Sequence, residues 1–224
     1  MPLVSIIVPI FNGEATLRST INSVINQTFR DFECILINDA STDNSKKFIE
    51  KFLNNDKRFV LINNEINMGV TYSRNKGIKI SRGKFLCFLD SDDIWMPNFL
   101  DLHLSFRRNN PNSAITYSPY YVFSKNNSKI SGYVVKPPHK IDSNNIFHKN
   151  HIPLLTVMLD IEIIGEIVFS EIRPEDYYLW VELIYKKGFI ARSLNKFSAY
   201  YRVSSTQRSS NKLLAIRRLY HLYY

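Results

Sequence analysis

The sequence predicts an α/β fold with a doubly wound, mostly parallel sheet. Two observations support this prediction. Over roughly the first hundred residues, near-continuous apolar runs alternate with segments in which apolar residues recur at helical spacing. The apolar runs read as strands buried on both faces, as in parallel sheets, and short stretches rich in Gly, Asn, Ser and Asp separate the elements.

In this first part the expected strands are 4–10, 33–38, 59–62 and 84–89, and the expected helices are 14–27, 41–53 and 69–80. Leu17, Ile21 and Val24 give the first helix its apolar face. The second part is less regular: a helix 97–108, a strand 114–123, a long loop 124–151 with at most one short helix, a helix 174–187 and a strand 197–203.

The composition fits one domain. The chain has 224 residues, of which 45% are apolar and 22% charged, so a substantial core is expected. A formal charge of +9 favours polyanionic partners, such as an anionic membrane face or a phosphorylated ligand. No nucleic-acid motif is recognisable, and we expect no nucleic-acid partner. Cys34 and Cys87 lie inside apolar runs, which indicates buried thiols and a cytoplasmic location.

Acidic residues gather where the strand 84–89 ends. Asp90 and Asp92 alternate along an extended segment, so their side chains can point the same way. Carboxylates packed together raise one another's pKa, and a divalent cation removes that conflict. Oxygen ligands suit Mg²⁺ or Mn²⁺, usually held by one or two carboxylates together with substrate phosphates. The alternative is that Asp92 or Asp93 caps a following helix.

A second acidic residue, Asp39, follows the strand 33–38. It is expected at the same edge of the sheet, where doubly wound folds bind ligands. Its carboxylate can accept hydrogen bonds from a nucleobase N–H or a ribose hydroxyl. Asp43 is interpreted as a helix cap. Arg74 can reach the nucleotide from the helix 69–80, although a solvated arginine is the more ordinary interpretation of this residue alone.

Four segments, in this order, resemble inverting glycosyltransferase family 2 with the GT-A fold, of the bacterial surface-polysaccharide type. They are VSIIVPIFNGEATLRSTINSVINQTF, CILINDASTDNS, NMGVTYSRNKGI and GKFLCFLDSDDIW. The resemblance is dense over about the first hundred residues and sparser afterwards. It implies that Phe11 stacks on the nucleobase, that Pro9 and Glu14 flank this pocket, and that Asp39 hydrogen-bonds the base.

The resemblance also implies roles around the phosphates. Arg74 would face the nucleotide, Asp90 would bind the ribose, and Asp92 would ligate the metal. Asp93 is an alternative metal ligand or a helix cap. The segment Tyr201–Ser205 resembles a C-terminal segment of the family that often contains a histidine, and this chain has Ser204 at the place of that histidine.

The pair Glu175 and Asp176 opens the expected helix 174–187. Acidic residues in the first turn complement the helix dipole, which by itself explains both. The resemblance implies instead that Asp176 is the general base that takes the proton from the acceptor hydroxyl. Glu175 is a weaker candidate contact with the diphosphate or the acceptor.

Weaker candidates follow in the divergent part. Arg202 and Arg208 are expected near the diphosphate, and Thr156 near the acceptor. Residues 211–224 predict a basic, amphipathic helix that either docks on the catalytic domain or contacts an anionic membrane. We therefore expect one domain, with a nucleotide-sugar half at about 1–95 and an acceptor half at about 96–210.

The resemblance thus implies a metal-dependent transfer of a sugar, from a UDP-sugar donor to a glycan or lipid-linked acceptor, in the cytoplasm or at the inner face of the membrane. A nucleotidyltransferase-like enzyme and a non-catalytic nucleotide- or anion-binding protein remain as alternatives. No Gly-x-Gly-x-x-Gly and no P-loop follows the first strand, which disfavours a dehydrogenase.

Overall fold

The computed structural model describes residues 1–53, 56–124 and 130–203. The predicted helix 211–224 and the candidate Arg208 lie outside the described residues. In the part that the structure describes, no helix is long and apolar enough to cross a membrane.

Among these described residues, the larger of two sheets has eight strands in the order β3-β2-β1-β4-β10-β6-β11-β9. Its parallel part consists of β1 (Val4–Ile10), β2 (Phe32–Asn38), β3 (Phe59–Asn63) and β4 (Phe85–Phe88). The strand β1 is central, because Val4 lies opposite Phe32 on one side and Phe85 on the other. All seven residues of β1 are buried, as the unbroken apolar run predicts.

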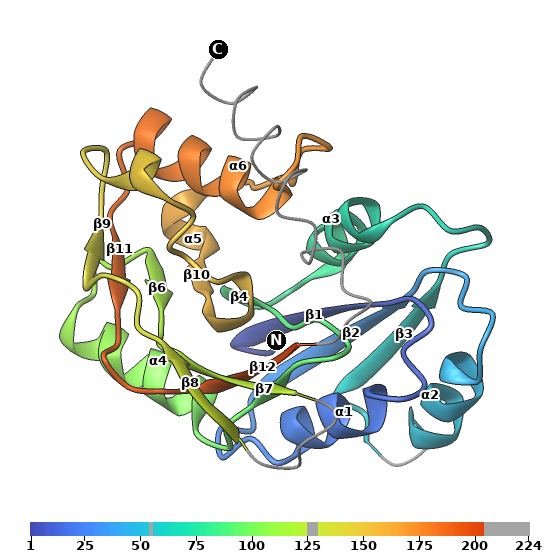
Figure 1. Cartoon of the computed structure of the whole chain (residues 1–224). Coiled ribbons are helices and arrows are strands. Elements are labelled where there is room, and N and C mark those ends of the chain that lie inside the picture. The colour runs from blue at the N-terminus through green and yellow to red at the C-terminus, as the bar shows by residue number, and fades with distance from the viewer. Residues whose placement is uncertain (54–55, 125–129, 204–224) are drawn as a thin grey trace.

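Helices cover both faces of this sheet (Figure 1). One face carries α1 (Leu17–Ile25), α2 (Ser45–Leu53) and α4 (Phe99–Asn109), and the other carries α3 (Val70–Ile80), α5 (Ile161–Ile164) and α6 (Glu175–Val181). Side chains of β1 alternate between the two cores: Ile6 and Val8 pack into the first, and Ile7 packs into the second. The predicted doubly wound α/β architecture is confirmed.

The second half of the chain completes the same sheet. The strand β10 (Met158–Asp160) runs antiparallel between β4 and β6 (Ile115–Tyr117). Beyond β6 lie β11 (Ala191–Ser193), parallel to it, and β9 (Lys140–Ile141). The expected donor and acceptor halves therefore share one sheet.

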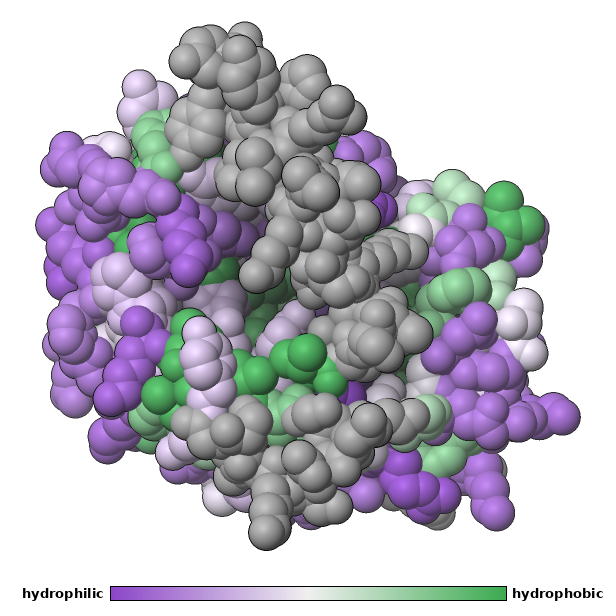
Figure 2. Space-filling model, viewed as in Figure 1, coloured by the Kyte–Doolittle hydropathy of each residue, from purple (hydrophilic) through white to green (hydrophobic). Residues whose placement is uncertain are grey.

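A smaller sheet has the order β5-β12-β7-β8. Its strands are β5 (Ile94–Trp95), β12 (Ala199–Val203), β7 (Tyr120–Ser124) and β8 (Ile130–Val135). Tyr120 and Tyr201 pack one face of it against the core that contains α1 and α4. In the space-filling view, apolar residues gather in the lower central part of the visible face, over these strands (Figure 2).

Two sequence-based expectations in this region were wrong. The single strand 114–123 is two strands in different sheets, because Pro119 has no N–H to donate and the chain leaves the large sheet there. The expected long loop 124–151 contains the strands β8 and β9; the one short helix allowed there is present as a 3₁₀ turn, Ile146–His148. The polar composition of this segment gives no apolar pattern that would predict these strands, which form by pairing with β7 and β11.

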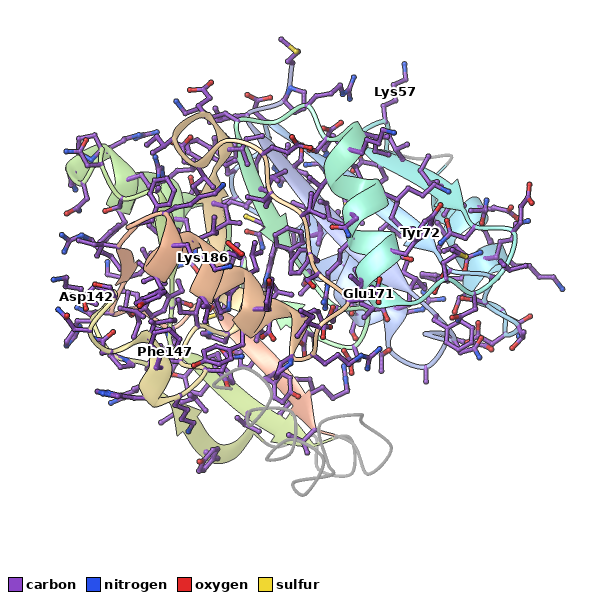
Figure 3. All side chains as sticks on the ribbon, turned by 90° about the horizontal axis from the view of Figure 1, so that it is seen from above. Lys57, Tyr72, Asp142, Phe147, Glu171 and Lys186 are labelled. Carbon is purple, nitrogen blue, oxygen red and sulfur yellow. The ribbon has the colours of Figure 1, made fainter. Side chains whose placement is uncertain are left out.

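The expected helix 174–187 begins at Glu175 and changes at Glu182 into a π-helical turn that ends at Lys186. A second 3₁₀ turn, Leu154–Thr156, precedes β10. Seen from above, the segment containing Glu171 lies beside α3, on which Tyr72 is located (Figure 3). Hydrogen bonds between the Asn75 side chain and the Phe169 backbone, at 2.8 and 2.9 Å, fasten this segment to α3.

Candidate active site

The loops after β1 and β2 are interlocked at the carboxyl edge of the sheet. Asn12 Oδ1 accepts a hydrogen bond from the Thr42 amide at 2.8 Å, and the Asn12 amide donates to Ser41 Oγ at 3.1 Å. Asn12 and Ala40 both have positive φ, of 51° and 54°, so each loop turns sharply as it leaves its strand. Pro9 is buried in β1, whereas Phe11 is 46% exposed. An exposed ring at this edge fits the stacking role that the resemblance implies.

Glu14 is committed to the neighbouring loop. Its carboxylate accepts a hydrogen bond from the Asn44 side chain at 2.8 Å, and its amide donates to Asp43 Oδ2 at 2.9 Å. Asp43 Oδ1 also accepts from the Ser45 amide at the start of α2, as the capping interpretation predicts. Glu14 thus ties the loop after β1, which carries Phe11, to the loop after β2.

Asp39 fixes the beginning of α3. Its buried carboxylate accepts hydrogen bonds from Asn64 Nδ2 at 2.7 Å, from the Met68 amide at 2.9 Å and from the Gly69 amide at 2.8 Å. Since a carboxylate has about four acceptor positions, about one stays available to a ligand. The same residue can therefore anchor α3 and accept a hydrogen bond from a base.

Arg74 joins two elements that are distant in sequence. Its Nη2 donates to Asp90 Oδ1 at 2.8 Å, and its Nη1 donates to Glu175 Oε1 at 3.1 Å. The guanidinium carbon lies 5.5 Å from the centre of the Phe169 ring. Burial works to lower the pKa of Arg74, but the charges of Asp90 and Glu175 outweigh it and raise the pKa. The solvated-arginine interpretation is wrong, because this side chain is 5% exposed.

The Asp90–Asp93 loop is held from α1. Thr16 Oγ1 donates to the Ser91 carbonyl at 2.9 Å, and Thr20 Oγ1 donates to the Asp93 carbonyl at 2.8 Å. Asp93 is buried, and burial together with the charges of Asp92 and Asp90 raises its pKa well above the usual range. Neither Asp92 nor Asp93 caps a helix, because β5 follows directly.

Arg202 clamps the same loop. Its amide donates to Asp93 Oδ1 at 2.8 Å, and its Nε donates to the Asp92 carbonyl at 2.7 Å. Its Nη2 donates to Ser19 Oγ at 3.1 Å, and its guanidinium lies 4.5 Å from the centre of the Phe123 ring. The structure therefore shows Arg202 bound to the loop, a role that the expectation of a diphosphate contact did not include.

The possible ligands around Asp92 fit a metal ion whose coordination shell is completed by oxygen atoms of the substrate. No group of three or more His, Cys, Asp or Glu suited to a metal occurs among the described residues. Asp93 is committed to the Arg202 amide, which disfavours it as an alternative metal ligand. Asp90 is half-exposed and Asp92 partly exposed. One or two carboxylates with substrate phosphates are the usual set for Mg²⁺ or Mn²⁺.

Asp176 is partly buried in the first turn of α6. Its Oδ2 accepts a hydrogen bond from Asn150 Nδ2 at 3.0 Å. Burial raises the pKa of Asp176, and the hydrogen bond from Asn150 lowers it. The charge of Glu175 raises this pKa further, whereas the charge of Arg74 lowers it. The net effect is a raised pKa, which suits a group that must take up a proton. Asn150 carries no signal in the sequence, because it lies in a segment without any recognisable motif.

The expectation for Thr156 does not fit the structure. This residue has no exposed surface, and its hydroxyl donates to the Pro153 carbonyl at 3.0 Å while accepting from the Ser118 amide at 3.2 Å. It is packed in the interior of the acceptor half instead of facing a substrate. Two cavities, of about 460 and 310 Å³, are lined by other residues, among them Ser113 and Arg192 in one and Leu3 and Lys84 in the other.

The chain matches the family model "Glycosyl transferase family 2" over residues 5–159. It is 35% identical over 216 residues to WfgD of Escherichia coli, named a UDP-Glc:alpha-D-GlcNAc-diphosphoundecaprenol beta-1,3-glucosyltransferase, with 96% of this chain and 83% of that protein covered.

Solved structures share the fold. Residues 1–349 of TarS from S. aureus, in complex with UDP, have a TM-score of 0.72 at 23% identity, with 91% of this chain and 61% of that fragment covered. The mannosyltransferase PcManGT of Pyrobaculum calidifontis, in complex with GDP-Man and Mn²⁺, has a TM-score of 0.67 at 14% identity, with 99% and 62% covered. This chain thus spans about 61% of the TarS 1–349 fragment and 37% of the TarS chain without that truncation. From the family match and the fold together, the chain belongs to glycosyltransferase family 2, adopts the GT-A fold and is a glycosyltransferase.

Proposed function

We propose that this glycosyltransferase is metal-dependent and inverting, and that it moves a sugar from a UDP-sugar to a lipid-linked or polysaccharide acceptor in cell-surface glycan synthesis. The observation that carries the proposal is the Arg74 bridge. It connects Asp90, at the end of β4, with Glu175, which adjoins Asp176. The residue assigned to donor binding and the residue assigned to deprotonation of the acceptor hydroxyl thereby belong to one connected cluster of side chains.

The donor binds at the carboxyl edge of β1, β2 and β4. Phe11 stacks on the base, beside the buried Pro9 and the loop that Glu14 orders, and Asp39 uses its remaining acceptor position for the base. Asp90 holds the ribose, and Arg74 adds positive charge toward the nucleotide. Support comes from WfgD, whose name specifies UDP-Glc, and from TarS, whose fold is similar and whose crystals contain UDP.

The metal site is assigned to Asp92, with Asp90 beside it. A bound Mg²⁺ or Mn²⁺ would supply positive charge against the leaving diphosphate. The Mn²⁺ in PcManGT, which shares the fold, is consistent with this assignment. Arg202 and Thr20 contribute indirectly, since they hold the backbone of the Asp90–Asp93 loop in place.

The reaction needs one base. Asp176 takes the proton from the acceptor hydroxyl while that oxygen attacks the anomeric carbon, and the bond to the nucleoside diphosphate breaks on the opposite face. The configuration at the anomeric carbon inverts because there is a single displacement. Partial burial of Asp176 next to Asn150 keeps the carboxylate oriented for this transfer.

We assign the first 95 or so residues to the donor and about 96–210 to the acceptor, within one catalytic domain. The acceptor is a glycan on a lipid diphosphate at the cytoplasmic side of the membrane, in line with the acceptor in the name of WfgD. A net charge of +9 favours contact with such a diphosphate and with an anionic membrane surface.

The test is calorimetry with UDP-glucose, UDP-N-acetylglucosamine and UDP-galactose, with and without Mn²⁺, followed by transfer to lipid-diphosphate sugars. We expect UDP-sugar binding that metal strengthens and that Asp92→Ala weakens. Absence of nucleotide-sugar binding under all of these conditions would refute the proposal. Retention of configuration in the product would refute the inverting mechanism alone.

A further inference from the structure

The segment around Asn150 is fastened to α6 by two aromatic side chains. Tyr177 Oη donates to the Ile146 carbonyl at 3.0 Å, and Trp180 Nε1 donates to the Ile152 carbonyl at 3.1 Å. Both rings are fully buried. These bonds lie before and after Asn150 in the segment, so its backbone is fixed relative to α6 and to the base that α6 carries.

Only one of the two polar atoms of the Asn150 amide group has a hydrogen-bond partner among the described residues. Its Nδ2 donates to Asp176 Oδ2 at 3.0 Å, and this orientation is the one that a carboxylate demands, because an ionised carboxylate only accepts. Its Oδ1 is buried and has no hydrogen-bond partner in the part of the chain that the structure describes. A buried acceptor without a donor is unfavourable by about 1–3 kcal/mol, and folded proteins rarely keep one.

We propose that Asn150 is a positioning residue for Asp176 and that its Oδ1 accepts a hydrogen bond from the acceptor sugar. The donor is the hydroxyl or amide N–H on the ring carbon next to the reacting hydroxyl. This inference rests on the proposed function of Asp176 as the base. It names an acceptor class: a sugar with a vicinal pair of donors, such as an N-acetylhexosamine that reacts at the hydroxyl beside its acetamido group.

The geometry suits such a pair. Asn150 Oδ1 belongs to the same amide group as Nδ2, which donates to Asp176 Oδ2 at 3.0 Å, and substituents on adjacent ring carbons are likewise close neighbours. One substituent gives its proton to Asp176, and the other donates a hydrogen bond to Oδ1 without being deprotonated. Asn150 itself neither gains nor loses a proton.

The charged groups that act on Asp176 come from two elements. Glu175 on α6 raises its pKa, and Arg74 on α3 lowers it. His151, adjacent to Asn150, has a pKa lowered by burial and by nearby positive charges, so it is neutral near pH 7. The Asn150 side chain is therefore one of two neutral donors that favour the ionised base, the other being the Tyr177 amide, which donates to Asp176 Oδ1 at 2.8 Å.

The first arm of the test uses the full chain with lipid-diphosphate hexoses and N-acetylhexosamines and their monodeoxy analogues. Removing the donor next to the reacting hydroxyl should lower kcat/KM of the unaltered protein at least about tenfold, as expected for one buried hydrogen bond. Asn150→Ala should lose a similar factor on the intact acceptor and should no longer distinguish it from that analogue. Removal of a hydroxyl on a remote ring carbon is the control.

Two results of this arm would overturn the inference. One is equal sensitivity of Asn150→Ala and of the unaltered protein to the missing vicinal donor. The other is no sensitivity in the unaltered protein, which would mean that Oδ1 is satisfied by water alone.

The second arm needs no acceptor. In hydrolysis of the UDP-sugar by water, Asn150→Ala should move the acidic limb of the rate to higher pH, because the donor that stabilises the ionised Asp176 is lost. Asn144→Ala is the matched control, since Asn144 is exposed in the same part of the chain. An unchanged limb in Asn150→Ala would contradict the positioning role. If calorimetry shows that the unaltered protein binds no UDP-sugar, the proposed function is refuted, and this inference, which rests on it, is refuted as well.

Discussion

Arg74 and Glu175 are 101 positions apart in the sequence, yet Arg74 Nη1 donates to Glu175 Oε1 at 3.1 Å. The contact joins α3, whose start is fixed by Asp39, to the first turn of α6, which carries Asp176. Because Arg74 also binds Asp90, a single buried guanidinium sets the spacing between the donor residues and the proposed base.

The first prediction concerns this bridge. Arg74→Lys keeps the charge but loses the planar fork that reaches two carboxylates at once. Loss of one hydrogen bond to a charged group weakens an interaction by about 1.5–3 kcal/mol, so kcat/KM should fall roughly 10- to 150-fold. Steady-state kinetics check this. Arg58→Lys is the matched control, since Arg58 pairs with Asp56 before β3, and a comparable loss of activity there would contradict the argument.

The second prediction concerns the base. Asp176→Asn keeps the shape but cannot accept the proton, so the transfer rate should fall about 10²- to 10⁴-fold while UDP-sugar affinity stays the same. The raised pKa of Asp176 means that activity is lost on acidification at a higher pH than an ordinary aspartate would give. A pH profile of kcat/KM measures this. An acidic limb that survives in Asp176→Asn would assign it to another group.

The third prediction concerns the close contact of α3 with β1. A Cβ on Gly77 would lie 2.6 Å from Ile7 Cγ2, and Ile7 is fully buried. Gly77→Ala should therefore destabilise the protein by about 1–3 kcal/mol in urea unfolding, despite the better helix propensity of Ala. The displaced α3 should also weaken activity, because it carries Arg74.

A double mutant provides the control for that steric argument. Ile7→Ala removes the atoms that the new Cβ would meet, so Gly77→Ala should cost much less in that background. Additive effects of the two substitutions would show that the clash is not the cause.

The fourth prediction concerns His103, which is fully buried on α4. Its Nδ1 lies 2.8 Å from Thr116 Oγ1, and burial, assisted by the charge of Arg107, lowers its pKa to about 3. The unfolded chain binds the proton near pH 6.5, so the stability that neutral His103 contributes is complete above that pH. It is lost progressively as the pH falls from about 6.5 to about 3.

Urea unfolding at several pH values tests this. His103→Phe should flatten the pH dependence of stability in that window, because an aromatic ring remains but no proton is taken up. An unchanged slope in His103→Phe would mean that His103 is already protonated in the folded state.

Local sequence patterns predicted the structure correctly where the conformation of a segment depends mainly on its own residues. The strand Val4–Ile10 has the predicted bounds, and Cys34 and Cys87 are buried in strands as expected. These features follow from apolar runs and from strand length, which neighbouring elements do not alter. In β7 and β8 the same reasoning failed, because Pro119 ended one strand and pairing between strands created another.

The sequence by itself determined the doubly wound order of the first half and placed Phe11, Asp39, Asp90 and Asp92 after strands, because parallel strands end at a common edge. Only the tertiary structure decided what these residues touch. Whether Asp93 is buried, how Arg74 spans two carboxylates, and that Asn150 meets Asp176 depend on contacts between segments far apart in the chain. No local pattern encodes such contacts, since they arise when separate elements pack around the same core.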